Sequence, residues 1–330
     1  MIYLGIDVSK AKLDCCLLLN TEAGKRKNKC VGNNARGFSD LLHWIDKLGV
    51  VRTDVRALME GTGVYHTPAA IALTQAQVGV SILNPARVRS YAQSMGMQTK
   101  NDQVDSMAIA QYGARHPDKL ILWEIPSPQA LALKAMLSRR EALERDLQRE
   151  RNRKEKADFL KAPEYIQDSL EESINFIKAQ IKKLNKTIDE HIDRHPDLKE
   201  DMALLVSIPS VAQKTGTAML SIMHQHHFRR PEQVSAYLGA NPVEYSSGSS
   251  VARRPHLSKA GPSNVRATLY MATVSAIGHN PCIKAFYEHL RAQGKPAMVA
   301  MGAAMRKLIH LCFAVLKNRT PFDPNYAKNH

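Results

Sequence analysis

The chain opens with Met1-Ile2-Tyr3-Leu4-Gly5-Ile6-Asp7-Val8-Ser9-Lys10. Apolar residues at Ile2, Leu4 and Ile6 alternate with other residue types, a period-two pattern that predicts a sheet strand. Asp7 lies where this strand is expected to end, and Gly5 leaves room for another group to approach the backbone. A carboxylate on a rigid central strand is well placed to hold a metal ion, provided that other acids converge on it.

The segments that follow predict a mixed α/β sheet. Strand patterns cover residues 13–19, the neighbourhood of 28–31, 55–59 and 79–83, and helical spacing covers 38–45 and 67–77. The first connections are short enough for two hairpins, with a turn at 21–24, and Asn84-Pro85 stops the last strand. Three antiparallel strands followed by alternating helix and strand are the order of a ribonuclease-H-like domain, which we place at residues 1–125.

Three further acids are candidates to join Asp7. Glu60 ends the predicted strand at 55–59, and Asp102 and Asp105 open a predicted helix. Acids three residues apart share a helix face and are favoured at a helix start, so a structural reading stays open in which Asp102 is an N-cap and Asp105 a first-turn acid. Around one pocket, four carboxylates cannot all stay ionised without cations. They therefore predict a site for two divalent ions that clamp a scissile phosphate, with Lys100 as a nearby phosphate contact.

The charge of the chain predicts a polyanionic partner. The formal net charge is +15 and the isoelectric point is near 9.6. From Val211 to the C-terminus the sequence contains 15 Lys and Arg residues but only four acids, so most of the excess positive charge lies in this part. This distribution favours nucleic acid as the partner over an ordinary basic protein without one.

Other features favour a cytoplasmic protein with no membrane partner. No apolar run approaches the roughly 20 residues of a membrane span, and Asp7 and Lys10 interrupt any signal-peptide pattern. The five cysteines contain no C-x-x-C pair, which indicates neither a disulfide framework nor a zinc site.

The middle of the chain predicts long helices. Ser127-Pro128 has the residue types of an N-cap and a first helical position, and charged helical sequence continues to about residue 192. A heptad seam is formed by Leu170, Ile174, Ile177, Ile181, Leu184 and Ile188. Ala162-Pro163 interrupts two helices, so the seam predicts either a hairpin within one chain or paired helices of a dimer. We place this linker and assembly segment at residues 126–196.

A helical corner is predicted near Ile208-Pro209. A helix starting at Lys214-Thr215 would aim backbone N–H groups at a phosphate, and Lys214 would add its charge. An ordinary helix-turn-helix corner fits the same residues.

A serine-rich stretch follows at residues 245–250. Serines around one glycine are typical of a flexible loop. The same hydroxyls are followed by Arg253, Arg254, Lys259 and Arg266, residue types that bind phosphate and offset its charge during attack. A serine in this setting is a candidate nucleophile. Helices rich in Ala and Met are expected to continue to about residue 316.

Taken in order, these motifs resemble the DEDD insertion-sequence transposases, a family that includes Piv-type DNA invertases and bridge-RNA-guided recombinases. The motifs that carry the resemblance are Gly5-Ile6-Asp7-Val8-Ser9-Lys10, Glu60-Gly61-Thr62-Gly63, Asn84-Pro85, Lys100-x-Asp102-x-x-Asp105, Ile208-Pro209, Tyr245-x-Ser247-Gly248 and Ser258-Lys259-Ala260-Gly261. They cover nearly the whole chain. Ser210 and Ala212 depart from the pattern, because the corresponding hairpin in the family usually carries glycines.

The resemblance implies a Holliday-junction-resolvase-like N-terminal domain, a coiled-coil linker and a mainly α-helical C-terminal transposase domain, here residues 197–330. It implies that Asp7, Glu60, Asp102 and Asp105 bind Mg²⁺ (or Mn²⁺), and that Ser247 attacks DNA and becomes covalently joined to it. The implied partners are donor and target DNA, a structured noncoding guide RNA, and further copies of the chain in a dimer or tetramer whose subunits share active sites. Ser246 leaves the register of the nucleophile open by one residue.

Three other functions fit parts of the sequence. A metal-dependent junction nuclease would use the acids with water and form no protein–DNA adduct. A sugar-kinase-like ATPase would share the Gly5-Ile6-Asp7 strand, but needs a second Asp-x-Gly strand and a glycine-rich adenosine loop, neither of which the sequence contains. A non-catalytic nucleic-acid-binding scaffold would depend neither on metal nor on the acids.

Overall fold

The computed structural model describes residues 1–20, 25–61, 63–97, 101–247 and 251–325, and only the backbone of 245–247 and 251–254. The predicted turn at 21–24 and the side chain of Lys100 lie outside these residues. The chain divides into two compact units, Met1–Ile125 and Pro126–His330. The expected boundary at residue 196 lies inside the second unit and stays a prediction.

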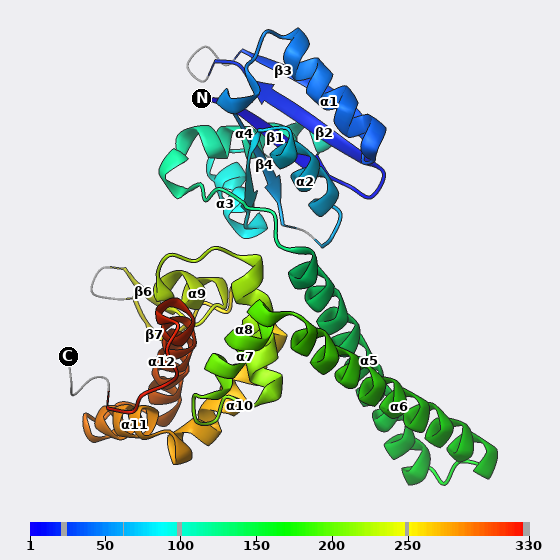
Figure 1. The fold of residues 1–330 in the computed structure, drawn as a ribbon, viewed down its shortest axis with the longest axis vertical. Helices are drawn as coiled ribbons and strands as arrows, with labels where there is room; N and C mark the ends of the chain where they lie inside the picture. The colour runs from blue at the N-terminus through cyan, green and yellow to red at the C-terminus, as the bar shows by residue number, and fades with distance from the viewer. Residues whose placement is uncertain (21–24, 62, 98–100, 248–250, 326–330) are drawn as a thin grey trace. The chain divides into compact units, whose positions relative to one another are not determined.

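The first unit is built on a five-stranded mixed sheet with the strand order β3-β2-β1-β4-β5 (Figure 1). Strand β1 (Ile2–Val8) pairs antiparallel with β2 (Lys12–Leu18) and parallel with β4 (Val55–Glu60), while β3 (Arg26–Gly32) continues the antiparallel side and β5 (Gly79–Leu83) the parallel side. This is the strand order of a ribonuclease-H-like fold, as the sequence predicts.

Helices cover both faces of this sheet. One apolar cluster joins sheet residues to Leu41 and Ile45 of α1 (Ala35–Lys47) and to Leu73 of α2 (Thr67–Gln75). The other cluster joins Tyr3 and Leu58 to α3 (Pro85–Ser94) and α4 (Asp102–Arg115). Both faces of the central strands are therefore buried, which explains why consecutive residues of β1 and β4, and not only alternate ones, are buried.

Helix α3 is not predicted from the sequence. Asn84-Pro85 does stop β5, but it also starts this helix: the Asn84 side chain accepts a hydrogen bond from the Ala86 backbone N–H at 2.9 Å, and Pro85 takes the first helical position. Only Val88 and Tyr91 of α3 are buried. Two apolar residues are too few to show a helical period in the sequence.

Gly5 allows α4 to lie directly on β1. A Cβ atom at Gly5 would fall 2.0 Å from the Ser106 carbonyl oxygen and 2.5 Å from the Ala110 backbone nitrogen. The group that approaches Gly5 is therefore the backbone of a helix. At the other end of the contact, a Cβ atom at Gly113 would fall 2.0 Å from Leu58 Cδ1. This direction of α4 brings its N-terminus to the end of β1 that carries Asp7.

The second unit begins with a long antiparallel helical hairpin of α5 (Pro128–Phe159) and α6 (Glu164–Arg194) (Figure 1). As predicted, Ser127 is the N-cap of α5, and its hydroxyl accepts a hydrogen bond from the Ala130 N–H at 3.3 Å. In the α6 seam, Ile174 and Ile188 are buried. Of the two predicted arrangements, the described structure thus forms the hairpin within one chain.

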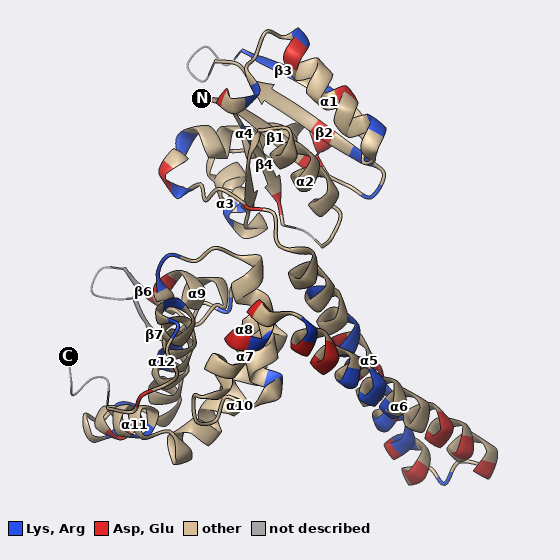
Figure 2. Ribbon diagram, in the orientation of Figure 1, with Lys and Arg blue, Asp and Glu red and all other residues tan. Residues whose placement is uncertain are grey.

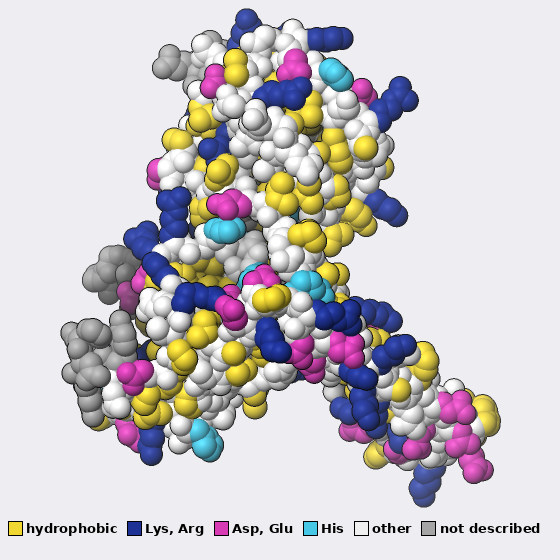
Figure 3. Space-filling view, viewed as in Figure 1, with side chains coloured by type: hydrophobic (Ala, Val, Ile, Leu, Met, Phe, Trp, Pro, Cys, Tyr) yellow, Lys and Arg dark blue, Asp and Glu magenta, His cyan; other side chains and the backbone are white. Residues whose placement is uncertain are grey.

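Large apolar side chains remain exposed at the turn of this hairpin. Phe159, Leu160 and Tyr165 are 86%, 75% and 71% exposed, and Figure 3 shows apolar side chains at the far end of the hairpin. Lys and Arg residues occupy many positions of α5 (Figure 2), where Arg149 and Arg153 pair with acids of the same helix. This pairing is typical of a solvated helix face.

The rest of the second unit is mainly helical. Its elements are α7 (Pro196–Val206), α8 (Gln213–Gln225), α9 (Pro231–Tyr237), the antiparallel hairpin β6 (Pro242–Ser247) and β7 (Val251–Leu257), α10 (Ser263–His279), α11 (Pro281–Ala292) and α12 (Ala297–Asn318). One apolar core joins these helices to the base of the α5–α6 hairpin, through Leu133 and Ile188.

Helix α12 is the one described helix that is long and apolar enough to cross a membrane, with a mean hydropathy of 1.6 over its most apolar 18 residues. Arg306 and Lys307 interrupt its apolar residues, so the sequence does not show it as a continuous apolar run. Leu308, Ile309 and Cys312 of this helix are fully buried in the core of the unit. This burial is what a core helix requires.

Candidate active site

The candidate site begins with two acids that face each other across β1 and β2. Asp7 and Asp14 are direct partners in the antiparallel register, so their side chains lie on the same face of the sheet. Asp14 is 9% exposed and Asp7 is half-buried. Asp14 is not among the acids predicted from the sequence. A signal was available, since pairing the two predicted strands around the Ser9–Lys12 turn places these acids opposite each other.

Glu60 reaches the same edge of the sheet from the neighbouring strand. Ile6 of β1 pairs with Met59 of β4 in parallel register. Asp7 and Glu60 are the next residues of their strands, and Glu60 ends β4 and is half-buried. The parallel pair therefore brings both carboxylates to one end of the sheet, as expected.

The remaining two acids come from the first turn of α4. The N-cap of this helix is Asn101, whose side chain accepts a hydrogen bond from the Val104 N–H at 2.8 Å. The reading of Asp102 as the N-cap is therefore wrong. Asp102 is the first helical residue, and it shares the first turn with Asp105. Because the cap is supplied by a neutral residue, both carboxylates are available for other contacts.

The acids of β2 and α4 act on the pKa of Asp7. Burial raises the pKa of Asp7 above its usual value, and the negative charges of Asp105, Asp102 and Asp14 raise this pKa further. Carboxylates repel one another in this way only when they lie close together. The acid cluster is defined here as Asp7, Asp14, Asp102 and Asp105, with Glu60 at its edge.

Lys12 contributes a cation to the acid cluster. Its ammonium nitrogen lies 2.6 Å from Asp102 Oδ2 and 2.9 Å from Asp14 Oδ2. The hydrogen bond from Lys12 lowers the pKa of Asp102, and the hydrogen bonds to Asp102 and Asp14 raise the pKa of Lys12. Sequence reasoning misses Lys12, because an isolated lysine at a strand start carries no pattern.

The acid cluster fits a hard divalent cation by its chemistry, because all of its donors are carboxylate oxygens. Burial and then the charges of the neighbouring acids raise the pKa of Asp7, so a bound cation would favour its ionised form. Within the described residues, however, no three His, Cys, Asp or Glu side chains are grouped in a way that could hold a metal ion. The Lys12 ammonium lies between Asp14 and Asp102, where a cation is needed.

The predicted phosphate-binding residues of the second unit fall into two groups. Lys214 lies in the first turn of α8, where its ammonium is 2.8 Å from Glu144 Oε1 of α5. Ser210, in the corner before α8, has a φ of +78°, a conformation that favours glycine. The corner thus keeps the backbone shape of a glycine turn although the glycine is replaced.

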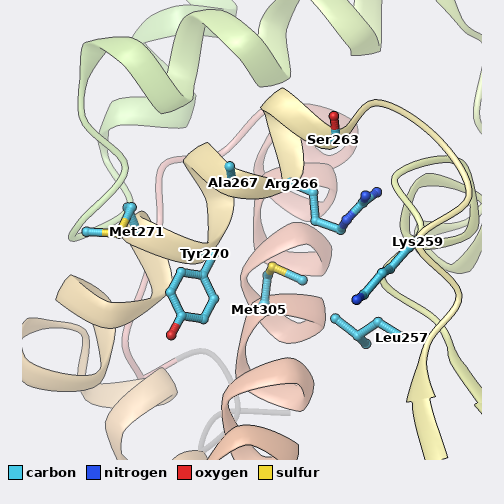
Figure 4. Close-up of a pocket in the computed structure, with 8 residues that line it drawn as sticks. All are labelled: Leu257, Lys259, Ser263, Arg266, Ala267, Tyr270, Met271 and Met305. Atoms are coloured by element: carbon cyan, nitrogen blue, oxygen red, sulfur yellow. The ribbon is translucent and has the colours of Figure 1, made fainter. Parts of the chain in front are cut away.

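The second group, Lys259 and Arg266, lines one pocket (Figure 4). Ser247 is the last residue of β6 and pairs with Val251, while Ser246 pairs with Ala252 and Tyr245 with Arg253. The serine stretch is therefore partly strand rather than a continuous loop. The side chains of Ser247, Arg253 and Arg254 lie outside the described residues, so their predicted roles stay predictions.

Comparisons with known proteins cover both units. A family model described as "Transposase" matches residues 4–157, and one described as "Transposase IS116/IS110/IS902 family" matches residues 202–288. The chain is 29% identical over 323 residues to the pilin gene-inverting proteins of Moraxella bovis and Moraxella lacunata, covering 97% of this chain and 97% of each relative. A structure of Thermus thermophilus RuvC is similar at 14% identity and a TM-score of 0.29, over 37% of this chain and 99% of that chain. The chain belongs to the IS110 family of transposases.

Proposed function

We propose that this protein is the recombinase of an insertion sequence, which cuts DNA and rejoins it to a new partner. Membership of a transposase family supports this function, and the relatives in Moraxella are named for the inversion of a gene. The observation that carries the proposal is the convergence of Asp102, Asp105 and Asp14 on Asp7, with the rise in the Asp7 pKa that follows. Such a cluster on a ribonuclease-H-like sheet suits phosphodiester chemistry.

The acids Asp7, Glu60, Asp102 and Asp105 would hold Mg²⁺ or Mn²⁺. The bound ion would lower the charge on the scissile phosphate and polarise the attacking oxygen. Asp14 and Lys12 lie beside these ligands. Asp14 adds negative charge to the site, and Lys12 offsets part of that charge at Asp102.

The attacking oxygen in this proposal is the hydroxyl of Ser247. It would form a bond to phosphorus while one phosphorus–oxygen bond to the DNA sugar breaks, which leaves a free hydroxyl on the departing strand. The phosphoserine diester keeps the energy of the original bond, so a second DNA hydroxyl can reverse the step without ATP. Arg253 and Arg254 would offset the transition-state charge, and Lys100, Lys214, Lys259 and Arg266 would hold nucleic acid along its phosphates.

The partners in this proposal are donor DNA, target DNA and a structured noncoding guide RNA. The protein would bind them in the cytoplasm. The basic excess after Val211 supports the binding of nucleic acid. A dimer or tetramer is supported by the exposed Phe159, Leu160 and Tyr165 at the turn of the α5–α6 hairpin, because large apolar groups gathered at one exposed end favour protein contacts.

A metal-dependent junction nuclease is the second candidate. The observation that favours it is that the acid cluster lies complete within the first unit, so hydrolysis by a metal-activated water would need no residue of the second unit. The two functions differ in one product: a recombinase of the proposed type passes through a protein–DNA adduct, and a nuclease does not.

The test of the proposed function is strand exchange between DNA fragments that carry the element's own ends and target, with the RNA that co-purifies with the protein. We expect recombinant product with Mg²⁺ and none in EDTA. Asp7→Asn and Asp105→Asn should each lower the product by about 100-fold or more. Asp118→Asn, an exposed acid of the same unit, is the matched control and should leave it unchanged. Full activity in EDTA or in both acid variants would contradict the proposal.

A further inference from the structure

A pocket with a volume of about 510 Å³ lies in the second unit between α10, α12 and the end of β7 (Figure 4). Two kinds of residue line it. Lys259 and Arg266 are cationic, while Leu257, Tyr270, Met271 and Met305 are largely apolar. None of the described residues that line it is acidic. The pocket is therefore positive and apolar at once. It belongs to the second unit, whereas the acid cluster belongs to the first.

The cationic end of the pocket is held in place by backbone contacts. Lys259 has a φ of +53°, which is unusual for a residue with a side chain, and its N–H donates to the Gly239 carbonyl at 3.1 Å. A Cβ atom at Gly261 would fall 2.0 Å from the Tyr237 carbonyl oxygen. Arg266 donates to the Leu238 carbonyl at 3.0 Å. These contacts fix the backbone of the loop that carries Lys259.

The apolar end lies one turn further along α10. Tyr270 and Met271 are 36% and 64% exposed, whereas Met305 below them is 2% exposed. Because Arg266 and Tyr270 are four residues apart on one helix, they share a face, about 6 Å apart along its axis. Ser263, in the first turn of α10, also lines the pocket, so the positive end of the helix dipole lies on the cationic side.

We propose that this pocket binds one unstacked nucleotide of a single-stranded segment, with its base against Tyr270 and Met271 and its phosphate at Lys259 and Arg266. The order of charge and apolar surface along α10 matches the order of phosphate, sugar and base in a nucleotide. The proposal rests on the proposed function, because it takes the nucleic acid of that reaction as the source of the nucleotide. DNA and RNA both supply this chemistry.

Charge complementarity favours a nucleotide over a second copy of the chain. A contact with an apolar protein surface would not require two cations at one end of the pocket. It would also not require a lining whose described residues include no acid. The pocket also adjoins the hairpin that carries the proposed nucleophile. Leu257 ends β7 and pairs with Pro242, and Ser247 lies five residues further along β6, roughly 17 Å away along the strand.

The test compares the binding of labelled 12-nucleotide probes to the full chain by fluorescence anisotropy. The probes are oligo-dT, oligo-rU and an abasic strand of the same length. We expect the wild-type protein to bind oligo-dT or oligo-rU about fivefold or more tightly than the abasic strand, as base stacking on an aromatic ring predicts. The tighter of the two identifies DNA or RNA as the source.

The variants separate the two ends of the pocket. Tyr270→Ala and Met271→Ala should each reduce the preference for bases, while Tyr270→Phe keeps its ring and should keep the preference. Met298→Ala is the matched control for Met271→Ala, because Met298 is 66% exposed on α12 and outside the pocket lining. Lys259→Gln should weaken all probes alike and lower the slope of log affinity against log salt by about one.

Two results would overturn the proposal. One is a wild-type protein that binds the abasic strand as tightly as both base-carrying probes. The other is a preference for bases that survives unchanged in both Tyr270→Ala and Met271→Ala. If Tyr270→Ala in addition lowers the mass of an oligomer, the occupant of the pocket would be a second copy of the chain. These results are distinguishable from a failure of the proposed function. A protein that shows no strand exchange, but still prefers bases through Tyr270, would contradict the recombinase function and support the nucleotide-binding pocket.

Discussion

Lys12 and Asp102 form an ion pair that ties the start of β2 to the start of α4, although the two residues are 90 positions apart in the chain. The same ammonium contacts Asp14, so one lysine bridges two acids of the cluster. A divalent ion that uses Asp102 as a ligand must compete with this contact. Lys12 therefore acts on the acid cluster in two opposing ways: it stabilises the cluster before the ion binds, and it weakens binding of the ion.

Lys12→Met should raise the affinity of the protein for Mn²⁺ about two- to fivefold, because an exposed ion pair is weak and its loss frees Asp102. Titration calorimetry with Mn²⁺ measures this directly, without DNA. Lys10→Met removes the same charge from an exposed position two residues away and should have little effect. Weaker Mn²⁺ binding in Lys12→Met would show instead that the lysine supports the metal site.

Gly5→Ala should destabilise the first unit by about 2–4 kcal/mol, because the new methyl group would collide with the backbone of α4 at Ser106 and Ala110. It should also weaken Mn²⁺ binding, since α4 carries Asp102 and Asp105. Denaturant unfolding gives the change in free energy. Gly278→Ala is the control, because a Cβ atom there meets nothing within 4 Å. Equal stability of the two variants would contradict the close packing of α4 on β1.

Local patterns in the sequence predict the sheet well. The bounds of β1 and β5 agree with the alternation of their apolar residues, because both strands are buried and flanked by turn residues. The acids at strand ends and at the start of α4 are also predictable, since parallel strands end at one edge of a sheet. Lys12 and Asp14 are not found in this way, because their roles depend on the register between strands and on a contact with a distant helix.

The heptad seam of α6 shows a different limit. The spacing of Ile174 and Ile188 predicts that another helix packs along them, but the same spacing serves a helix of the same chain or of a partner. In the described structure α5 covers the seam. Phe159, Leu160 and Tyr165 at the turn of the hairpin stay exposed, and their spacing is not that of a heptad.

Asp7→Asn should make the protein more stable at neutral pH in EDTA. The pKa of Asp7 is raised in the folded state, so the folded protein binds a proton that the unfolded chain has lost, and stability falls as the pH rises from about 4 through the raised pKa. Asparagine cannot ionise and avoids this loss. Thermal unfolding at pH 7 should show the gain, and at pH 3 the gain should vanish. A gain that is equal at both values would exclude ionisation of Asp7 as its cause.

The exposed turn of the α5–α6 hairpin should support self-association. Phe159→Ser combined with Tyr165→Ser replaces two exposed aromatic rings and should lower the mass measured by light scattering. The fold should survive, because neither ring is buried. Glu172→Ser, at an exposed position of α6, is the control. An unchanged mass in the double variant would assign any oligomer to another surface.

Ser247 is the proposed nucleophile, and its chemistry requires help. A serine hydroxyl is a poor nucleophile at neutral pH, so a metal ion or a base must lower the cost of losing its proton. The acid cluster would supply the ion, and arginines near the serine would offset charge on the phosphate. Attack by water at the same cluster would cut DNA as well, but would leave no bond between protein and DNA.

Ser247→Ala should therefore bind the oligo-dT probe as the wild-type protein does, yet form no covalent adduct with DNA and no recombinant product. A denaturing gel with end-labelled DNA measures the adduct as a band that protease treatment removes. Ser246→Ala tests the register and should retain the adduct, and Tyr245→Phe tests the neighbouring hydroxyl in the same gel. An adduct that persists in Ser247→Ala and disappears in one of the other two would move the nucleophile to that residue. Mg²⁺-dependent cleavage by Ser247→Ala at the wild-type rate, with no adduct in any protein, would favour the junction nuclease.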